Sequence, residues 1–353
     1  MSRTIIHLID PIHPAPAFIN EAAAVIQHGG LVAFPTETVY GLGADALDAH
    51  AAARIFEAKQ RALNDPLIVH VHEPQLDALV DLAALTNTQR RDLQTLTDAF
   101  WPGPLTLVLP KRAHVPSVIS AGLDTIAVRM PDHPVARALI AAARTPIAAP
   151  SANLFGHVSP TTAQHVLDDL DGRFDMLLDG GPTRIGVEST VLSLLHSPPR
   201  ILRPGGITRE MLLALGIPAE RAPHSSHSDS PDTDAQLAPG MLTSHYAPRA
   251  TLEIAPSLAA LRKRCAELAS HNTRIGILLT SAQITQCPDL HPQFDLGASL
   301  DDIARSLYAG LRALDDAAVD VILVTRIPPD GLGDALADRL GRAAGRKVDS
   351  DGG

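Results

Sequence analysis

The sequence contains little cysteine and no long hydrophobic run. Its two cysteines, Cys265 and Cys287, lack the spacing of a metal-binding pair, so we expect neither a disulfide scaffold nor a structural zinc site. The longest apolar runs, such as residues 105–109, are far shorter than the roughly 20 residues that a membrane-spanning helix needs. The N-terminal residues also lack the apolar core of a secretory signal. We therefore expect a cytoplasmic protein that does not enter a membrane.

Aromatic and basic residues are scarce as well. Aromatic side chains make up 3% of the sequence, and the formal net charge is -10. Affinity for a phosphate backbone comes largely from lysine and arginine, and single-stranded nucleic acids stack their bases on exposed aromatic rings. We therefore expect no strong direct binding to nucleic acid, although a local basic pocket is compatible with this composition.

The length of 353 residues exceeds that of a typical single domain of roughly 100–200 residues. Residues 219–240 are rich in Ser, Pro, Asp and His, and they contain too few bulky apolar residues to offset the entropy of ordering. This composition predicts a first domain over residues 1–218 and a smaller domain over residues 250–353. Between them we predict a linker, residues 219–249, which is a candidate cover for a site in the first domain.

Helical and strand periods alternate before the linker, which predicts an α/β domain with a mixed sheet and covering helices. The predicted strands are residues 31–34, 67–71, 105–109, 125–130, 147–149, 176–178 and 190–195. The predicted helices are residues 18–28, 48–58 and 74–97. After the linker, strands at 251–254, 274–279 and 319–324 alternate with helices at 257–269 and 298–313. This second pattern predicts a small Rossmann-like unit.

Several polar segments interrupt these apolar strands. The first, PTETVYGLG at residues 35–43, is either a strand end with a glycine turn or a ligand-binding loop that offers hydroxyl groups and close backbone approach. Lys59 and Arg61 follow a predicted helix, where they are either solvated charges at its C-terminus or a clamp for triphosphate oxygens. Residue types alone leave both pairs of alternatives open.

Further polar residues flank later strands. Thr125 and Arg129 share one face of a strand, and an arginine there needs either a structural carboxylate or a ligand carboxylate as its partner. Ser151 and Asn153 leave the next strand, and of Ser159 and Thr161 we expect one to cap the following helix. Each of these signals is weak when taken singly.

Common catalytic signatures are absent from the sequence. It has no phosphate-binding loop of the G-x-x-x-x-G-K-[ST] type, no H-E-x-x-H motif and no G-x-S-x-G elbow. The 16 histidines show no regular metal-ligand spacing. We therefore expect neither a covalent nucleophile on the protein nor a dedicated metal site.

The ordered set of segments resembles the YrdC-like threonylcarbamoyl-AMP synthase family. The segments that carry the resemblance are PTETVYGLG, the KxRxxxxPL pattern at residues 59–67, TIAVRMP at 125–131, SAN at 151–153, and STV followed by RPG. A set of this many segments in order is far more specific than any one of them. The sequences PGM at 239–241 and HYAP at 245–248, with GLGDALADRLGRAA near the C-terminus, resemble the longer, two-domain form of the family.

The resemblance implies a twisted, mostly open mixed α/β sheet and a second, Rossmann-like domain. It implies a nucleotidyltransferase that converts L-threonine, bicarbonate or CO2, and ATP into threonylcarbamoyl-AMP and pyrophosphate for threonylcarbamoyladenosine modification of tRNA. A separate transferase complex would receive the product. Mg²⁺ would accompany ATP without a recognisable protein motif to hold it.

The resemblance also assigns residues. Lys59 and Arg61 would be catalytic, acting by charge neutralisation on the phosphates. L-threonine would contact Thr38, His70, Arg129, Ala149 and Ser189, with Arg129 on its carboxylate. ATP would contact Lys59, Arg61, Asp65, Thr125, Ser151, Asn153, Ser159, Arg203 and Tyr246. Three positions depart from the family pattern: Asp65 and Asp338 stand where asparagine is usual, and Leu154 follows SAN where serine is common.

Two other functions compete with this interpretation. A carbamoyltransferase carries a similar domain, but it is larger, with a further catalytic domain and in some cases cysteine-rich zinc motifs. A noncatalytic RNA-binding or ribosome-binding module would use the same concave surface, but the acidic charge and scarce aromatics oppose it.

Overall fold

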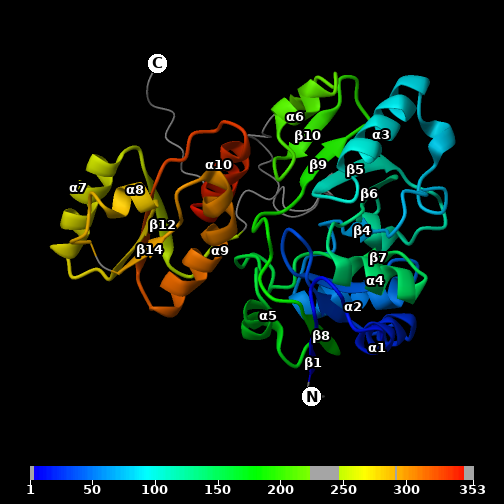
Figure 1. Ribbon diagram of the computed structural model, residues 1–353, viewed down its shortest axis with the longest axis horizontal. Coiled ribbons are helices and arrows are strands. Elements are labelled where there is room, and N and C mark those ends of the chain that lie inside the picture. Colours follow the sequence, from blue (N-terminus) through cyan, green and yellow to red (C-terminus); the bar gives the residue numbers. More distant parts are fainter. Residues whose placement is uncertain (1–3, 223–245, 291, 346–353) are drawn as a thin grey trace. The chain divides into compact units, whose positions relative to one another are not determined.

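The computed structural model describes residues 4–222, 246–290 and 292–345, and these form two compact units (Figure 1). The first unit holds the described chain up to Phe155, Pro160–Arg184, and residues 188–222. The second holds the described residues from 246 onward, together with two short segments, Gly156–Ser159 and Ile185–Val187. Glu220 and Arg221, which fall inside the predicted linker, form a strand of the first unit, and most of the remaining linker lies outside the described residues.

The first unit is built on a mixed sheet of eleven strands, in the order β1-β8-β2-β3-β7-β4-β6-β5-β9-β10-β11. The strands are β1 Ile5–Leu8, β2 Val32–Phe34, β3 Gly41–Asp45, β4 Ile68–His70, β5 Leu105–Pro110, β6 Thr125–Arg129, β7 Ile147–Ala148, β8 Met176–Asp179, β9 Thr190–Ser193, β10 Arg200–Arg203 and β11 Glu220–Arg221. The sheet contains both parallel pairs, such as β4 and β6, and antiparallel pairs, such as β5 and β6. The predicted mixed sheet is confirmed.

Sequence analysis missed strand β3, because it contains two glycines. Gly43 is required there by packing: a Cβ atom at this position would lie 2.6 Å from Phe34 Cε1 and 2.6 Å from Ile147 Cγ2. The glycine therefore lets β3 pair between β2 and β7 while the Phe34 ring and the Ile147 side chain cover it. Glycine lowers strand propensity, so a packing requirement of this kind hides a strand from pattern analysis.

Helices cover both faces of this sheet. They are α1 Pro16–Gln27, α2 Ala49–Lys59, α3 Asn87–Phe100, α4 Pro134–Ala143, α5 Ala163–Leu170 and α6 Arg209–Ala214, with 3-10 turns η1 Leu82–Ala84 and η2 Ser117–Ser120. Helices α1 and α4 bury one apolar cluster, whereas α2 and α5 pack into a second cluster. The prediction of a helix from residue 74 was wrong at its start, because Thr86 caps α3 in a capping box with Gln89.

The second unit contains a fully parallel sheet in the order β12-β15-β13-β14. Its elements are β12 Thr251–Ala255, α7 Leu258–Ala269, β13 Ile275–Leu279, α8 Ser281–Ile284, β14 Gln293–Asp295, α9 Leu300–Asp316, β15 Val321–Thr325 and α10 Leu332–Ala343. Helix α9 begins with a capping box formed by Ser299 and Asp302, and it buries its apolar stripe. Parallel strands joined by helices confirm the predicted Rossmann-like unit.

The two inserted segments are integral to the second unit. The Ala247 N–H donates to the Gly156 carbonyl at 2.9 Å, and Arg312 donates to the Val158 carbonyl. Gly186 has φ +85° and leaves no room for a side chain, since a Cβ atom would lie 2.4 Å from the Ala304 carbonyl oxygen. Only glycine permits so close an approach to helix α9.

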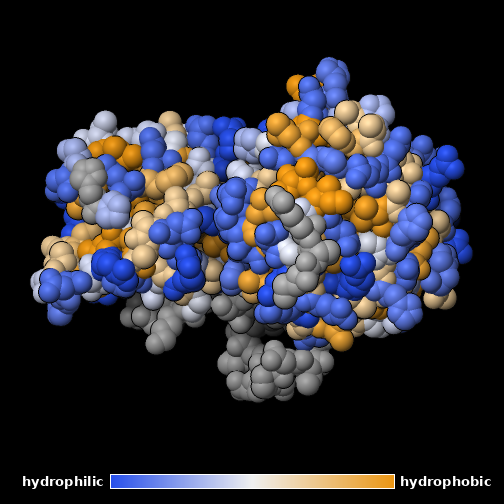
Figure 2. All heavy atoms as spheres, turned by 90° about the horizontal axis from the view of Figure 1, so that it is seen from below, coloured by the Kyte–Doolittle hydropathy of each residue, from blue (hydrophilic) through white to orange (hydrophobic). Residues whose placement is uncertain are grey.

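The face seen in Figure 2 is largely polar, with scattered apolar patches. Edge strand β1 exposes Ile5, Ile6 and Leu8. Across the described ranges, no helix is both long enough and apolar enough to cross a bilayer.

Candidate active site

Three neighbouring strands place polar side chains in one row. His70 on β4 pairs in register with Arg129 on β6, and Arg129 pairs in turn with Thr106 on β5. Residues that are directly opposite one another share a face of the sheet, so the three side chains lie side by side. All three are buried. The row joins two predicted threonine-binding residues to Thr106, which sequence analysis missed.

Arg129 has a structural carboxylate as its partner, which answers the question that strand spacing left open. Its Nη2 lies 2.5 Å from Glu37 Oε1, and its Nε donates to the Gly103 carbonyl at 3.3 Å. The other Glu37 oxygen, Oε2, is buried and accepts no hydrogen bond from any described residue. Sequence analysis did not single out Glu37, although its place inside PTETVYGLG and the need of a buried arginine for an acid were both signals.

His70 is held neutral by its surroundings. Burial lowers the pKa of His70 to about 3, and the positive charge of Arg129 acts in the same direction. Its Nδ1 atom is buried and makes no hydrogen bond to a described residue. A neutral imidazole can accept a hydrogen bond from a hydroxyl group, so this atom suits a polar uncharged ligand group.

The PTETVYGLG segment is a tight hydrogen-bonded turn before β3. Thr36 Oγ1 lies 2.8 Å from Thr38 Oγ1, accepts from the backbone N–H groups of Thr38 and Val39, and donates to the Val39 carbonyl at 2.6 Å. These bonds fix Thr38 in a fully buried position. The segment thus contains both a ligand-type loop and, from Gly41, a strand.

Ser189 and Arg203 extend the polar row on the other side. Ser189 Oγ lies 2.7 Å from Thr106 Oγ1, while Arg203 Nη2 donates to the Ser189 carbonyl at 3.1 Å and to its hydroxyl at 3.2 Å. Gly205 allows this approach, because a Cβ atom there would lie 2.4 Å from the Glu188 carbonyl oxygen. The turn after β10 therefore packs directly on the segment that enters β9.

A second group of buried charges surrounds the end of α2. Gln60 adopts a left-handed conformation that ends the helix, and Lys59 Nζ donates to the Ser151 carbonyl at 2.5 Å and to the Asn153 carbonyl. Burial lowers the pKa of Lys59 well below its ordinary value, and the charge of Arg61 lowers it further. Lys59 and Arg61 are 1% and 8% exposed, so the interpretation of solvated helix-end charges was wrong.

Asp65 holds Arg61 in place. Arg61 Nη2 lies 2.8 Å from Asp65 Oδ2 and donates to the Pro66 carbonyl at 2.9 Å. Burial raises the pKa of Asp65, whereas the charges of Arg61, Lys59 and Arg203 oppose that rise. Lys59 binds the carbonyl of Ser151, two residues from Ala149, whose N–H donates to the Ile68 carbonyl on the strand of His70. The second group therefore lies close to the polar row.

The remaining predicted residues have different positions. Thr125 begins β6, and the backbone N–H of Ala149 donates to the Ile68 carbonyl at 2.9 Å, next to His70. Ser159 and Tyr246 belong to the second unit. The expected helix cap at Ser159 or Thr161 was wrong, since Thr162 caps α5.

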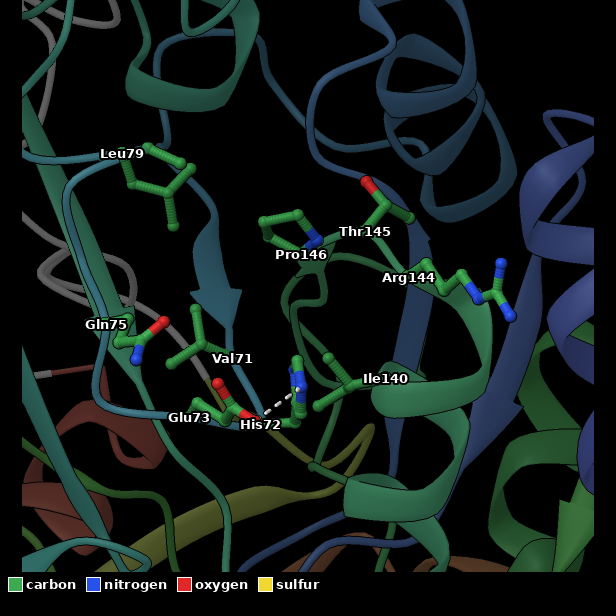
Figure 3. Close-up of a pocket in the computed structure, with 10 residues that line it drawn as sticks. Val71, His72, Glu73, Gln75, Leu79, Ile140, Arg144, Thr145 and Pro146 are labelled. Atoms are coloured by element: carbon green, nitrogen blue, oxygen red, sulfur yellow. Dashed lines mark ion pairs between the residues drawn. The ribbon is translucent and has the colours of Figure 1, made fainter.

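A separate pocket of about 150 Å³ lies beyond the end of β4 (Figure 3). Its lining includes Val71, Leu79, Ile140 and Pro146, and an ion pair at 3.5 Å joins His72 to Glu73 at its edge. None of the predicted site residues lines it.

Comparison with known proteins identifies the family. The Sua5, YciO and YrdC family model, described as telomere recombination, matches residues 24–205, and the model described as threonylcarbamoyl-AMP synthase, C-terminal domain, matches residues 207–345. The chain belongs to the threonylcarbamoyl-AMP synthase family. Two relatives with that name, from Pyrococcus abyssi (strain GE5 / Orsay) and Bacillus subtilis (strain 168), are 44% and 42% identical. The matches cover 94% and 98% of this chain, and 95% and 98% of the relatives.

A solved structure of a synthase-family relative supports the fold. The crystal structure of Pyrococcus abyssi Sua5 complexed with L-threonine is 43% identical and superposes with a TM-score of 0.88. The superposition covers 97% of this chain and 98% of that one, so both units of the family's two-domain form are present.

Proposed function

We propose that this chain makes threonylcarbamoyl-AMP and pyrophosphate from L-threonine, bicarbonate or CO2, and ATP, using the buried polar groups of the first unit. The observation that carries the proposal is the proximity of two sets of buried residues: the His70, Arg129 and Thr106 row, and the cations Lys59 and Arg61, which bind backbone carbonyls of the segments next to β4. In the reaction, the amino group of threonine forms a carbamate with CO2. A carbamate oxygen then attacks the α-phosphorus of ATP, and the bond to pyrophosphate breaks.

The threonine half of the site is the polar row. Arg129 Nη1 makes no hydrogen bond to a described residue, and it is the atom we assign to the carboxylate of threonine. His70 Nδ1 is the acceptor that we assign to the threonine hydroxyl. Thr38, Ser189 and the backbone at Ala149 complete this half.

The nucleotide half is the second group of charges. Lys59 has three N–H donors, of which two bind the carbonyls of Ser151 and Asn153, and the third is left for a phosphate oxygen. Phosphate charge would raise the pKa of Lys59 and keep it protonated. Asp65 fixes the direction of Arg61 through their ion pair. Thr125, Ser151, Asn153 and Arg203 would contact the rest of ATP, and the roles of Ser159 and Tyr246 remain predictions.

Positioning and charge neutralisation are the catalytic contributions that these residues can make. We propose that Mg²⁺ enters as part of the Mg·ATP substrate. The ranges that the structure describes contain no group of three His, Cys, Asp or Glu side chains suited to a metal ion. We further propose that the enzyme acts in the cytoplasm and passes its product to a separate tRNA-modifying transferase complex.

The test is threonine-dependent pyrophosphate release from ATP, L-threonine, bicarbonate and Mg²⁺. We expect Arg61→Ala and Arg129→Ala each to lower the rate by about 100-fold or more, since each removes hydrogen bonds between charged groups. Arg137→Ala is the matched control, because Arg137 is exposed on α4. Full activity in both site variants, with native circular dichroism, would show that the site is misplaced. Salt-dependent RNA binding without ATP turnover would favour the RNA-binding alternative.

A further inference from the structure

We infer that Glu37 binds the amino group of the amino-acid substrate, so that the Glu37 and Arg129 pair recognises a zwitterion. The inference rests on the proposed function, because it needs the threonine carboxylate to bind at Arg129. It adds a role for Glu37, which is the only buried acid that is ion-paired to Arg129 in the described part of the chain.

The uncommitted oxygen of Glu37 is the first observation. Glu37 is 1% exposed, and its Oε1 accepts a hydrogen bond from Arg129 Nη2 at 2.5 Å. Its Oε2 is also buried, but it has no hydrogen-bond donor among the described residues. Buried carboxylate oxygens are rarely left in this state, because losing water without gaining a donor is unfavourable. A substrate ammonium group would supply the missing donor.

The neighbours of Glu37 do not supply that donor. His133 is close enough for the Glu37 charge to oppose the effect of burial on the His133 pKa, but no hydrogen bond joins the His133 ring to Glu37 Oε2. The Thr36 and Thr38 hydroxyls bind each other, and Thr36 also donates to the Val39 carbonyl. The acceptor therefore lies within the loop that the family motif forms, next to Arg129, and is not used by the fold.

Charge matching is the second observation. The Arg129 and Glu37 pair carries no net charge, and neither does a zwitterionic amino acid. Its carboxylate and ammonium groups are both bonded to the same α-carbon. Arg129 opposite the carboxylate and Glu37 opposite the ammonium group would give two matched charge pairs in a buried site. A plain carboxylic acid would instead bring a second negative charge beside Glu37 without an ammonium group to offset it. Such like-charge juxtaposition selects against the wrong ligand.

The experiment compares two ligands by isothermal titration calorimetry: L-threonine and (R)-3-hydroxybutyrate, which has the same carboxylate and hydroxyl but no amino group. Glu37→Gln keeps the size of the side chain, and its amide oxygen can still accept a hydrogen bond from Arg129. We expect it to weaken L-threonine binding by about 10- to 100-fold, the range for a hydrogen bond between charged groups, and to leave (R)-3-hydroxybutyrate binding unchanged or tighter. Glu57→Gln, at an exposed position on α2, should change neither affinity.

The results that would overturn the inference can be told apart from those that would overturn the proposed function. Equal weakening of both ligands by Glu37→Gln would mean that Glu37 acts only on Arg129, and unchanged threonine binding would mean that Glu37 does not contact the substrate. Either result overturns the inference while the proposed function stands. If the wild-type protein binds no L-threonine and releases no threonine-dependent pyrophosphate, the proposed function fails as well. Should Glu37→Gln not fold, Glu37→Asp retains the charge, and the inference requires it to keep the preference for threonine over (R)-3-hydroxybutyrate.

Discussion

Each unit of this protein buries a cluster of charged side chains, and the two clusters differ in how completely they are bonded. On α10 of the second unit, Asp338 Oδ2 accepts from Arg339 at 2.8 Å and from Arg342 at 2.9 Å, and its Oδ1 accepts from Arg342 at 3.2 Å. In the first unit, Glu37 uses one oxygen on Arg129, and its other oxygen has no donor among the residues that the structure describes. Complete bonding is typical of a structural cluster, whereas the proposed substrate site requires an acceptor that the fold leaves unused.

The α10 cluster also supports aromatic residues. The Arg339 guanidinium lies 5.2 Å from the centre of the Tyr246 ring, which packs at 5.9 Å on Tyr308. Tyr246 has φ +63°, a left-handed conformation that is unfavourable for a bulky residue. The cluster therefore holds the chain in a strained conformation at a position inside the predicted linker, residues 219–249.

Removing the carboxylate of the complete cluster should have the largest effect on stability. Asp338→Ala removes the acid that binds both Arg339 and Arg342 in this buried cluster, and breaking such a pair costs about 3–5 kcal/mol. We expect this decrease in the free energy of unfolding when urea denaturation is monitored by a probe in the second unit. The affinity for L-threonine should be unchanged. Asp338→Asn, which has the residue usual in the family, keeps an acceptor and should lose less. A loss below 1 kcal/mol in Asp338→Ala, or a specific loss of threonine affinity, would remove the distinction between the clusters.

Much of the fold could be predicted from the sequence, because local periodicity reports local burial. Helix α9 and the central strands were predicted nearly to their ends, since their apolar residues recur at helical or alternating spacing. Strand β3 was missed because Gly43 is required by contacts with Phe34 and Ile147, which lie on the neighbouring strands β2 and β7. The start of α3 was misplaced because its cap at Thr86 was not recognised.

The candidate site divides in the same way. Motif resemblance supplied Lys59, His70 and Arg129. Strand register added Thr106, and the ion pair with Arg129 added Glu37, whose place inside PTETVYGLG had been a signal that sequence analysis did not use. Thr106 lies opposite Arg129 because β5 and β6 pair antiparallel, and a shift of one residue would have turned its side chain to the other face. Sequence spacing carries no information on such register between separate strands.

A second prediction tests His70, the neutral side chain next to Arg129 and Glu37 in the incomplete cluster. Because the pKa of His70 falls from 6.5 to about 3 on folding, the unfolded chain binds one more proton than the folded chain between these values. Stability should therefore fall as the pH drops below 6.5, by roughly 2 kcal/mol at pH 5 from this residue alone. His70→Gln should reduce the difference in unfolding free energy between pH 8 and pH 5 by that amount. Identical pH dependence in both proteins would mean that His70 can be protonated within the fold.

The smallest expected effect comes from the Thr106 hydroxyl, which links the polar row to Ser189. Thr106 Oγ1 lies 2.7 Å from Ser189 Oγ, which also accepts from Arg203. Thr106→Val keeps the shape of the side chain but removes this bond, so the unfolding free energy should fall by about 0.5–1.5 kcal/mol. Threonine affinity should fall by a few-fold, because Ser189 loses a fixed orientation. Thr106→Ser restores the hydroxyl and should recover most of both quantities. If valine lowers stability but leaves threonine affinity unchanged, Thr106 and Ser189 form a structural bond, and the incomplete cluster ends at Arg129.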